Sequence, residues 1–330
     1  MDEEGFKNYC LERKLSEKTI QAHVKIVKEF ETFLKINCQN RSITNATSAN
    51  LNTFVRHLME ENRNTWDNLL SLVRYTRFIN NKEIIAPLLD LLDGSDVLEN
   101  LSNTIKQTVG EAKHKAIFDG VKLPPLGTPS RDKPKITRKF MENLEAELGL
   151  SKCREILSSG PHASPKEQYL PEQKKFLEAK GIDDFLTKKH KKYVEELEEH
   201  MKQKTLYFTQ EITEEVLDYV RKTPTCQVGV REGDIIYVTK IPYMAKEYLR
   251  EKNPKKKRYY ACHCPWVREA IKSDLKISPN FCYCSAGFEK RLWDVIFGQD
   301  VKADVVRSVL KGDLVCKFAI HIPKEYSGKR

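Results

Sequence analysis

The stretch TPTCQVGVREGDIIYVTKI, residues 223–241, marks a change in the kind of secondary structure that the sequence predicts. Before Thr223-Pro224 apolar residues recur every three or four positions, as in helices, whereas afterwards the pattern is that of strands. Two apolar runs, Cys226–Val230 and Ile235–Ile241, flank Arg231-Glu232-Gly233-Asp234, which predicts a β-hairpin. The chain is therefore expected to join helices to an antiparallel sheet.

The C-terminal part, residues 226–330, is predicted to be a cysteine-rich α+β domain that binds a ligand or metal. A helix is expected over Ala286–Phe297, and Gly312-Asp313 predicts a turn. Extended segments are expected around them, at Tyr259–Cys264, Phe281–Cys284, Val301–Leu310 and Val315–Ile322.

Residues 1–92 show the apolar periodicity of a four-helix domain. A short helix is expected over Glu3–Arg13, and three more begin after Ser16, Thr47 and Thr65. The prolines of VKLPPLGTP, residues 121–129, cannot continue a helix, so residues 93–135 are predicted to be a linker and residues 136–225 a helical region. The fold class is multidomain, all-α and then α+β.

The net charge of +10 is unevenly distributed. Residues 1–92 hold 13 Lys/Arg and 12 Asp/Glu, a net of +1, and the run Lys255-Lys256-Lys257-Arg258 is predicted to be a solvated loop. No apolar run approaches the roughly 20 residues that span a bilayer, and the acidic start is unlike a signal peptide. These features predict a soluble, cytoplasmic protein without a membrane partner.

Five of the nine cysteines lie between residues 262 and 316. In a reducing compartment such clustering indicates metal or redox chemistry rather than structural disulfides. If both Cys-x-Cys segments are extended, each pair of thiols shares a face, and two pairs could converge on one tetrahedral zinc ion. A reversible redox pair and inert packing are the alternatives. The candidate metal ligands are Cys262, Cys264, Cys282, Cys284 and Cys316.

The first domain resembles the core-binding domain of tyrosine recombinases and phage integrases. The resemblance is carried by Phe6-x-x-Tyr9, Leu15-Ser16-x-Lys18-Thr19-Ile20 and Val27-x-x-Phe30-x-x-Phe33-Leu34, and it continues through the helices after Thr47 and Thr65. It implies a domain that clamps DNA, since helix N-termini and nearby cations bind phosphates. The expected DNA ligands are Lys14, Lys18, Thr19, Lys25, Lys28, Arg74 and Arg77. Solvation of the outer helix faces, or protein contact, is the alternative.

Recombination chemistry requires a tyrosine nucleophile with two arginines and a histidine around the scissile phosphate. No His-x-x-Arg step occurs in the sequence, and Tyr326 stands alone in a charged tail. The sequence therefore predicts that the recombinase active site is absent.

Residues 124–323 resemble an uncharacterised cysteine-rich prokaryotic family related to 4-vinyl-reductase-type small-molecule-binding domains. The resemblance is carried by Tyr260-Ala261-Cys262-His263-Cys264-Pro265, by Cys282-Tyr283-Cys284-Ser285-Ala286-Gly287-Phe288 and by Gly312-Asp313-x-x-Cys316. It implies a sensor module with zinc positions at Cys284 and Cys316. The other two positions would fall near Val305 and Ser308, which are poor zinc ligands.

Three functions follow from these patterns. The first is a DNA-binding protein whose thiol-rich domain senses a metal, redox state or small molecule. The second is a metal- or cysteine-dependent hydrolase, with a ligand pocket formed by His263, Trp266, Arg268, Phe288 and Trp293. His162, in a Ser/Gly/Pro-rich loop, is a further candidate functional residue, although a solvated role is the simpler reading. The third is a scaffold that binds proteins only.

Overall fold

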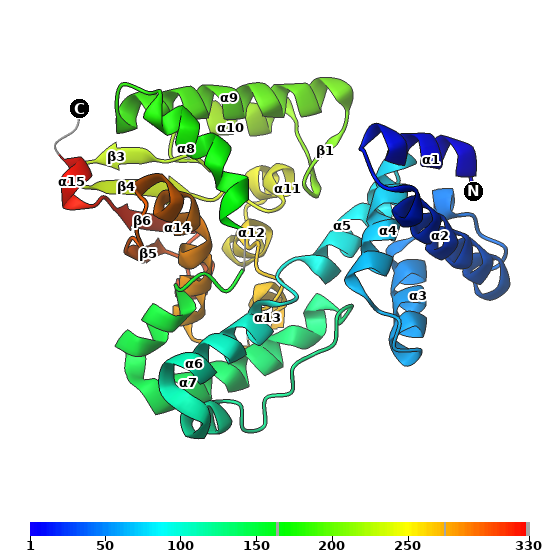
Figure 1. Ribbon diagram of the computed structural model, residues 1–330, viewed down its shortest axis with the longest axis horizontal. Coiled ribbons are helices and arrows are strands. Elements are labelled where there is room, and N and C mark those ends of the chain that lie inside the picture. The colour runs from blue at the N-terminus through cyan, green and yellow to red at the C-terminus, as the bar shows by residue number, and fades with distance from the viewer. Residues whose placement is uncertain (163–164, 274, 328–330) are drawn as a thin grey trace. The chain divides into compact units, whose positions relative to one another are not determined.

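The computed structural model describes residues 1–162, 165–273 and 275–327, which form two compact units. The first comprises residues 1–95 and 124–130, and the second comprises residues 96–123 and the chain from 131 onward. Figure 1 shows helices throughout the N-terminal part and strands only in the second unit. The expected order of a helical domain followed by an α+β domain is confirmed.

The helices of the first unit begin where the sequence offers capping side chains. The Ser16, Thr47 and Thr65 side chains accept hydrogen bonds from backbone amides three residues later, which satisfies donors that a helix start leaves unpaired. The elements are α1 (Glu3–Glu12), α2 (Glu17–Asn37), η1 (Ile43–Asn45), α3 (Ser48–Glu60), α4 (Trp66–Phe78) and α5 (Lys82–Leu92).

Helix α5 was not among the predicted helices, and it adds Ile84, Leu88 and Leu91 to the core of the first unit. Residues 124–130 return to the same unit: the Asn64 side-chain amide donates a hydrogen bond to the Leu126 carbonyl at 2.7 Å. The prediction of a linker over 93–135 is therefore wrong in part. About half of that range, Val97–Ile117, is helical, and Leu98, Leu101 and Ile105 lie on its buried face.

The second unit surrounds its sheet with helices. The longest carry the expected amphipathic pattern. The sequence predicts that the helix from Thr137 ends at Gly149, and α7 is interrupted there, because Gly149 has a non-helical φ of 71° and ψ of 168° at a kink between two helical segments. The helices are α6 (Val97–Ile117), α7 (Lys133–Leu157), α8 (Leu170–Leu177), α9 (Ile182–Gln203), α10 (Glu214–Lys222), α11 (Ala245–Arg250), α12 (Pro254–Ala261), α13 (Arg268–Ser273), α14 (Tyr283–Phe297) and α15 (Lys324–Ser327). Single 3-10 turns are η2 (Ser130–Asp132), η3 (Lys166–Tyr169), η4 (Pro279–Cys282) and η5 (Val309–Lys311).

A four-stranded antiparallel sheet has the order β3-β4-β6-β5. The predicted hairpin is present, since β3 and β4 pair Val230 with Tyr237. The strands are β3 (Val230–Glu232), β4 (Ile235–Thr239), β5 (Ala303–Arg307) and β6 (Lys317–His321), and a separate pair is β1 (Leu206–Tyr207) with β2 (Gln210–Glu211). Helix α14 packs against β5 and β6.

Three local predictions in the second unit are wrong. Tyr259–Cys264 and Phe281–Cys284 are not extended: the first is the end of α12 and its cap, and the second spans η4 and the start of α14. The basic run Lys255–Arg258 lies inside α12, because the Asn253 side chain accepts hydrogen bonds from the amides of Lys255 and Lys256. A proline at the first helical position also favours this start.

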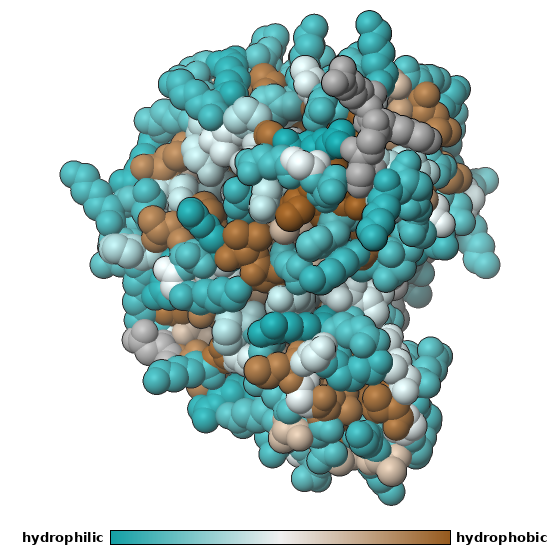
Figure 2. Space-filling model, turned by 90° about the vertical axis from the view of Figure 1, so that its left-hand side faces the viewer, coloured by the Kyte–Doolittle hydropathy of each residue, from teal (hydrophilic) through white to brown (hydrophobic). Residues whose placement is uncertain are grey.

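Figure 2 shows one face of the molecule, on which hydrophilic side chains cover most of the surface and hydrophobic ones form small separate groups. Within the described ranges, no helix combines the length and the apolar character needed to cross a bilayer.

Candidate functional site

Four of the five candidate thiols lie in one neighbourhood of the second unit, and we call Cys262, Cys264, Cys282 and Cys316 the thiol cluster. Cys262 interacts electrostatically with the other three, and its Sγ lies 3.9 Å from the Cys264 carbonyl oxygen. Burial raises the pKa of the Cys262 and Cys316 thiols, with the neighbouring thiols adding to the effect at Cys262. Burial therefore favours the neutral thiol form of Cys262, Cys282 and Cys316.

Within the described ranges, the thiol cluster does not bring three ligand atoms within 4.8 Å of one another. In the part of the chain that the structure describes, the only three potential ligand atoms that all lie within 4.8 Å of one another belong to Glu29, His57 and Glu61. Zinc coordination would require the thiols to lose protons and to approach more closely. The zinc prediction stays a prediction.

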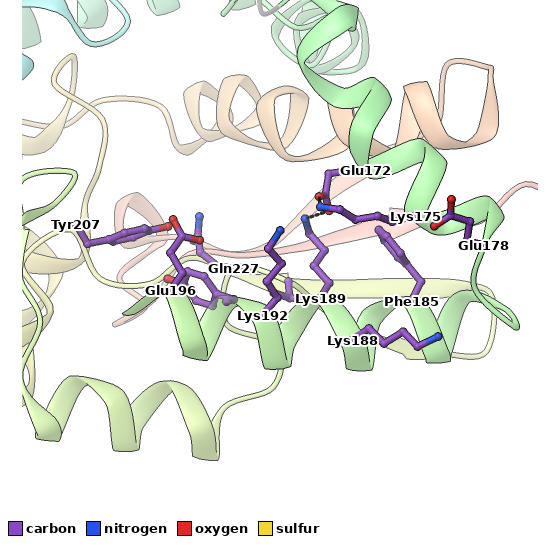
Figure 3. A pocket seen from close by; sticks show the side chains of 12 residues that line it. Glu172, Lys175, Glu178, Phe185, Lys188, Lys189, Lys192, Glu196, Tyr207 and Gln227 are labelled. Carbon is purple, nitrogen blue, oxygen red and sulfur yellow. Dashed lines mark hydrogen bonds and ion pairs between the residues drawn. The ribbon is translucent and has the colours of Figure 1, made fainter. Parts of the chain in front are cut away.

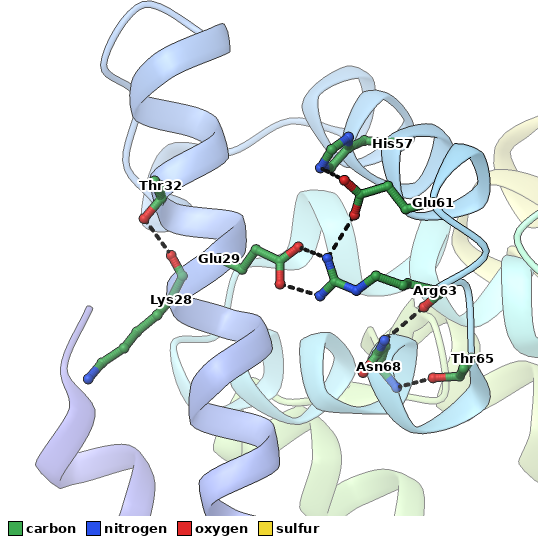
Figure 4. A network of polar contacts seen from close by, with 8 residues as sticks. All are labelled: Lys28, Glu29, Thr32, His57, Glu61, Arg63, Thr65 and Asn68. Carbon is green, nitrogen blue, oxygen red and sulfur yellow. Dashed lines mark hydrogen bonds and ion pairs between the residues drawn. The ribbon is translucent and has the colours of Figure 1, made fainter.

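The carboxylates of the Glu29, His57 and Glu61 group already pair with a positively charged side chain, that of Arg63, as Figure 4 shows. The Arg63 guanidinium donates to Glu29 through both terminal nitrogens and to Glu61 at 2.8 Å. These carboxylates raise the pKa of Arg63. The arrangement neutralises both acids, so we interpret it as a polar brace between α2 and the end of α3.

The fifth thiol, Cys284, contacts a histidine instead. Its Sγ lies 3.3 Å from Nε2 of His162, and the two residues are 122 positions apart in sequence. Burial, with a smaller effect of the Lys240 ammonium, lowers the pKa of His162 to about 4. The imidazole is therefore neutral near pH 7, and an unprotonated ring nitrogen can accept a hydrogen bond from a thiol.

A buried ion pair lies beside this contact. Lys240 Nζ is 3.3 Å from Oε1 of Glu289, and the two side chains are only 12% and 10% exposed. Lys240 also lies 5.1 Å from the centroid of the Phe288 ring. After burial, which has the larger effect, the charge of Lys240 lowers the pKa of His162 and His263, and it counteracts the rise in the pKa of Cys316 that burial causes. The same ammonium group therefore acts both on the partner of Cys284 and on a member of the thiol cluster.

The five residues predicted to line a ligand pocket play different parts. Trp266 and Trp293 are each 1% exposed and belong to the core. Arg268 is buried, and its guanidinium lies 4.4 Å from the Tyr243 ring centroid. His263 donates a hydrogen bond from Nε2 to the Ile241 carbonyl oxygen. Phe288 is 38% exposed and contacts His162.

A separate cavity of about 500 Å³ lies between α8 and α9 in the second unit (Figure 3). Lysines dominate one part of its wall, and aromatic rings form another. Glu172 holds two of the lysines, Lys175 and Lys189. The lining side chains include Lys188, Lys192, Phe185, Tyr193, Tyr207, Glu178 and Glu196. The alternating Glu and Lys residues of α9 are a sequence pattern typical of a solvated helix face, so the sequence alone does not indicate this cavity.

The predicted DNA ligands lie on the first unit. Lys14 lies in the left-handed turn between α1 and α2, and Lys18 and Thr19 occupy the first turn of α2. Lys14, Lys18, Lys25 and Arg77 are exposed, and none forms an ion pair within the described ranges. Two of the predicted ligands are engaged within the protein: Lys28 pairs with Glu3 at 2.5 Å, and Arg74 contacts the buried His23.

Two family models match segments of the chain. Residues 4–79 match the family model of the phage integrase N-terminal SAM-like domain. The resemblance of the first unit to integrases is confirmed. Residues 187–327 match a family of unknown function, DUF6144. No curated protein matches the chain. No solved structure matches it either.

Sequence reasoning singled out His162 but could not connect it to Cys284. It missed Lys240 and Glu289 entirely, since an isolated lysine and glutamate have no sequence pattern that marks them as buried. One local signal was available: Gly287 and Phe288 follow Cys284 by three and four residues, which is one face of a helix. Treating the segment as extended concealed that face.

Proposed function

We propose that the protein binds DNA through its first unit and that its second unit is a sensor based on thiols and a small-molecule pocket. The match to the integrase SAM-like domain carries the DNA-binding part of the proposal. The thiol cluster, and the cavity between α8 and α9, support the sensing part.

For DNA binding, the support lies at the start of α2. The amides of the first turn and the ammonium of Lys18 favour an anion there, and Lys25 lies two turns along the same helix face. Lys14 and Arg77 are additional exposed cations. With a net charge of only +1 over residues 1–92, binding is expected to be moderate in strength and sensitive to salt.

For sensing, four thiols share one neighbourhood, and one of them, Cys316, interacts electrostatically with the Lys240 ammonium. Oxidation could join two of them, and a soft metal such as zinc could bind after deprotonation. The resemblance of residues 124–323 to 4-vinyl-reductase-type domains, which implies a sensor module, is a further part of this proposal. A cavity of about 500 Å³ is large enough for a small ligand, and its lysines and aromatic rings suit an aromatic anion.

Fluorescence anisotropy with a labelled duplex of mixed sequence tests DNA binding. We expect binding at low salt and about 10-fold weaker binding for Lys18→Glu, because a repulsive charge replaces a phosphate contact. Lys35→Glu is the matched control, since Lys35 is exposed near the other end of α2. Absence of binding at low salt, or equal losses for both variants, would contradict the proposal.

The same assay tests sensing when the protein is fully reduced, oxidised with diamide or treated with a chelator. We expect the DNA affinity to change at least about 5-fold between two of these states, the lower end of typical coupling between sites. Elemental analysis and thiol titration identify the cause. Equal affinity in all states, together with the absence of bound metal, would rule out thiol-based sensing while leaving DNA binding intact.

A further inference from the structure

We propose that Cys284 is a nucleophilic thiol, with His162 as its proton acceptor, in a site for carbonyl compounds of the ester or amide class. The two groups are in contact, with Sγ and Nε2 3.3 Å apart. A nucleophile within hydrogen-bonding reach of a base is the basic arrangement for covalent catalysis. This activity is independent of DNA binding and of the thiol cluster.

One face of α14 is shaped to hold the histidine. Cys284, Gly287 and Phe288 are spaced by three and four residues, so they lie on the same side of the helix. A side chain at Gly287 would place its Cβ 2.7 Å from the Ser158 carbonyl oxygen. The glycine therefore lets the loop that carries His162 approach the helix backbone closely. The Phe288 ring then packs edge-on against the imidazole, 5.2 Å away.

The other side of the loop is anchored as well. The Asn100 side-chain amide of α6 donates a hydrogen bond of 2.8 Å to the carbonyl of Pro161, which is itself buried. His162 is thus placed by contacts before it in the chain and by α14 beneath it. Such positioning is what a proton acceptor requires, because proton transfer depends on a fixed short distance.

The surroundings supply a positive charge. The Lys240 ammonium lies near His162 and Phe288 and is held by Glu289, so it is placed to stabilise negative charge that develops on a substrate oxygen. Phe288, whose ring packs against His162, is 38% exposed, so the histidine side of the site lies next to the protein surface. Cys284 itself is 4% exposed, and Cys153 and Cys226, which are 0% exposed, lie among apolar side chains of the same core.

The reaction is acyl transfer. The Cys284 sulfur attacks the carbonyl carbon while its proton passes to Nε2 of His162, and a C–S bond forms. The bond from that carbon to the leaving oxygen or nitrogen breaks, and the leaving group takes the proton from His162. Water, activated by the same imidazole, then attacks the thioester, releasing the acid and restoring the thiol.

The test uses the full-length reduced protein with p-nitrophenyl acetate as the acyl probe. Nitrophenolate release gives the rate, and peptide mass spectrometry locates the acetyl group. We expect acetylation of Cys284 and about 100-fold slower acetylation in His162→Ala, with added imidazole restoring part of the rate. Cys153→Ser is the control and should react as the wild type does.

Two results would overturn the proposal: acetylation of other residues in preference to Cys284, or an equal rate in His162→Ala. If the thermal melt shows that His162→Ala does not fold, the test uses the relative acetylation rates of two cysteines in the wild-type protein. Cys284 must then react at least about 10-fold faster than Cys38, a partly exposed thiol without this arrangement. Slower reaction of Cys284 would reject the nucleophile. Gly287→Ala should also slow acetylation, because it displaces the loop that positions His162.

Discussion

The two units differ in the sequence separation of the contacts that define their main features, which are helix starts in the first unit and the candidate site in the second. In the first unit each helix begins at a side chain that caps its own first turn, as Ser16 and Thr65 do over three residues. In the second unit, His162 meets Cys284 across 122 positions, and Thr137 donates to the Trp266 carbonyl across 129. Local contacts therefore specify the elements of the first unit, whereas long-range packing places the candidate site of the second.

The largest expected effect comes from removing core packing beneath the site. Trp293→Ala should lower the free energy of unfolding of the second unit by about 3–5 kcal/mol, because the indole is 1% exposed and packs on Phe185 and Phe297. Trp66→Ala is the matched control: the Trp66 side chain is 50% exposed, so the loss of stability should be small. Urea unfolding followed by circular dichroism measures both, and similar losses would remove the contrast.

The next effect tests the close approach at α14. Gly287→Ala should destabilise the second unit by about 1–3 kcal/mol, since the new methyl group would lie 2.7 Å from the Ser158 carbonyl oxygen. Ser285→Ala, two positions earlier and half-buried, should change stability little. The thermal melts of the two variants give the comparison. A Gly287→Ala protein as stable as the wild type would show that the loop yields easily.

A smaller effect concerns acid stability in the first unit. Burial, followed by the charge of Arg74, lowers the pKa of His23 below its usual 6.5. The unfolded chain therefore binds more protons than the folded one as the pH falls below about 6.5, and the free energy of unfolding declines there. His23→Gln should flatten this decline in urea melts at pH 7 and pH 5. His57→Gln, at a half-exposed imidazole facing Glu61, should leave it in place.

The smallest effect belongs to a purely local contact. Ser16→Ala should cost about 1 kcal/mol, because it removes the side-chain acceptor at the start of α2. Ser42→Ala is the control, as Ser42 precedes η1 without a capping hydrogen bond. Hydrogen exchange should show the loss confined to the first turns of α2. A loss that spread through the whole unit would mean that the cap is not an isolated contribution.

Much of the architecture followed from the sequence because periodicity and caps are local. The caps at Ser16, Thr47 and Thr65, the helix over Ile182–Gln203 and the hairpin around Gly233 were all predictable from nearby residues. The errors came from segments whose local signals conflict. Around Cys262 and Cys282 the aromatic and cysteine-rich composition favours strands, but Asn253-Pro254 and Ser278-Pro279 start helical turns that tertiary packing extends.

The sequence by itself determined the order of the domains, the integrase-like helices and the concentration of thiols near the C-terminal end. Only the tertiary structure decided that Cys284 contacts His162, that Lys240 and Glu289 form a buried pair, and that four other thiols share a neighbourhood. The physical reason is the sequence separation between the residues that interact. Helix starts and turns depend on hydrogen bonds within a few residues, whereas a site depends on which distant surfaces the packed core brings together.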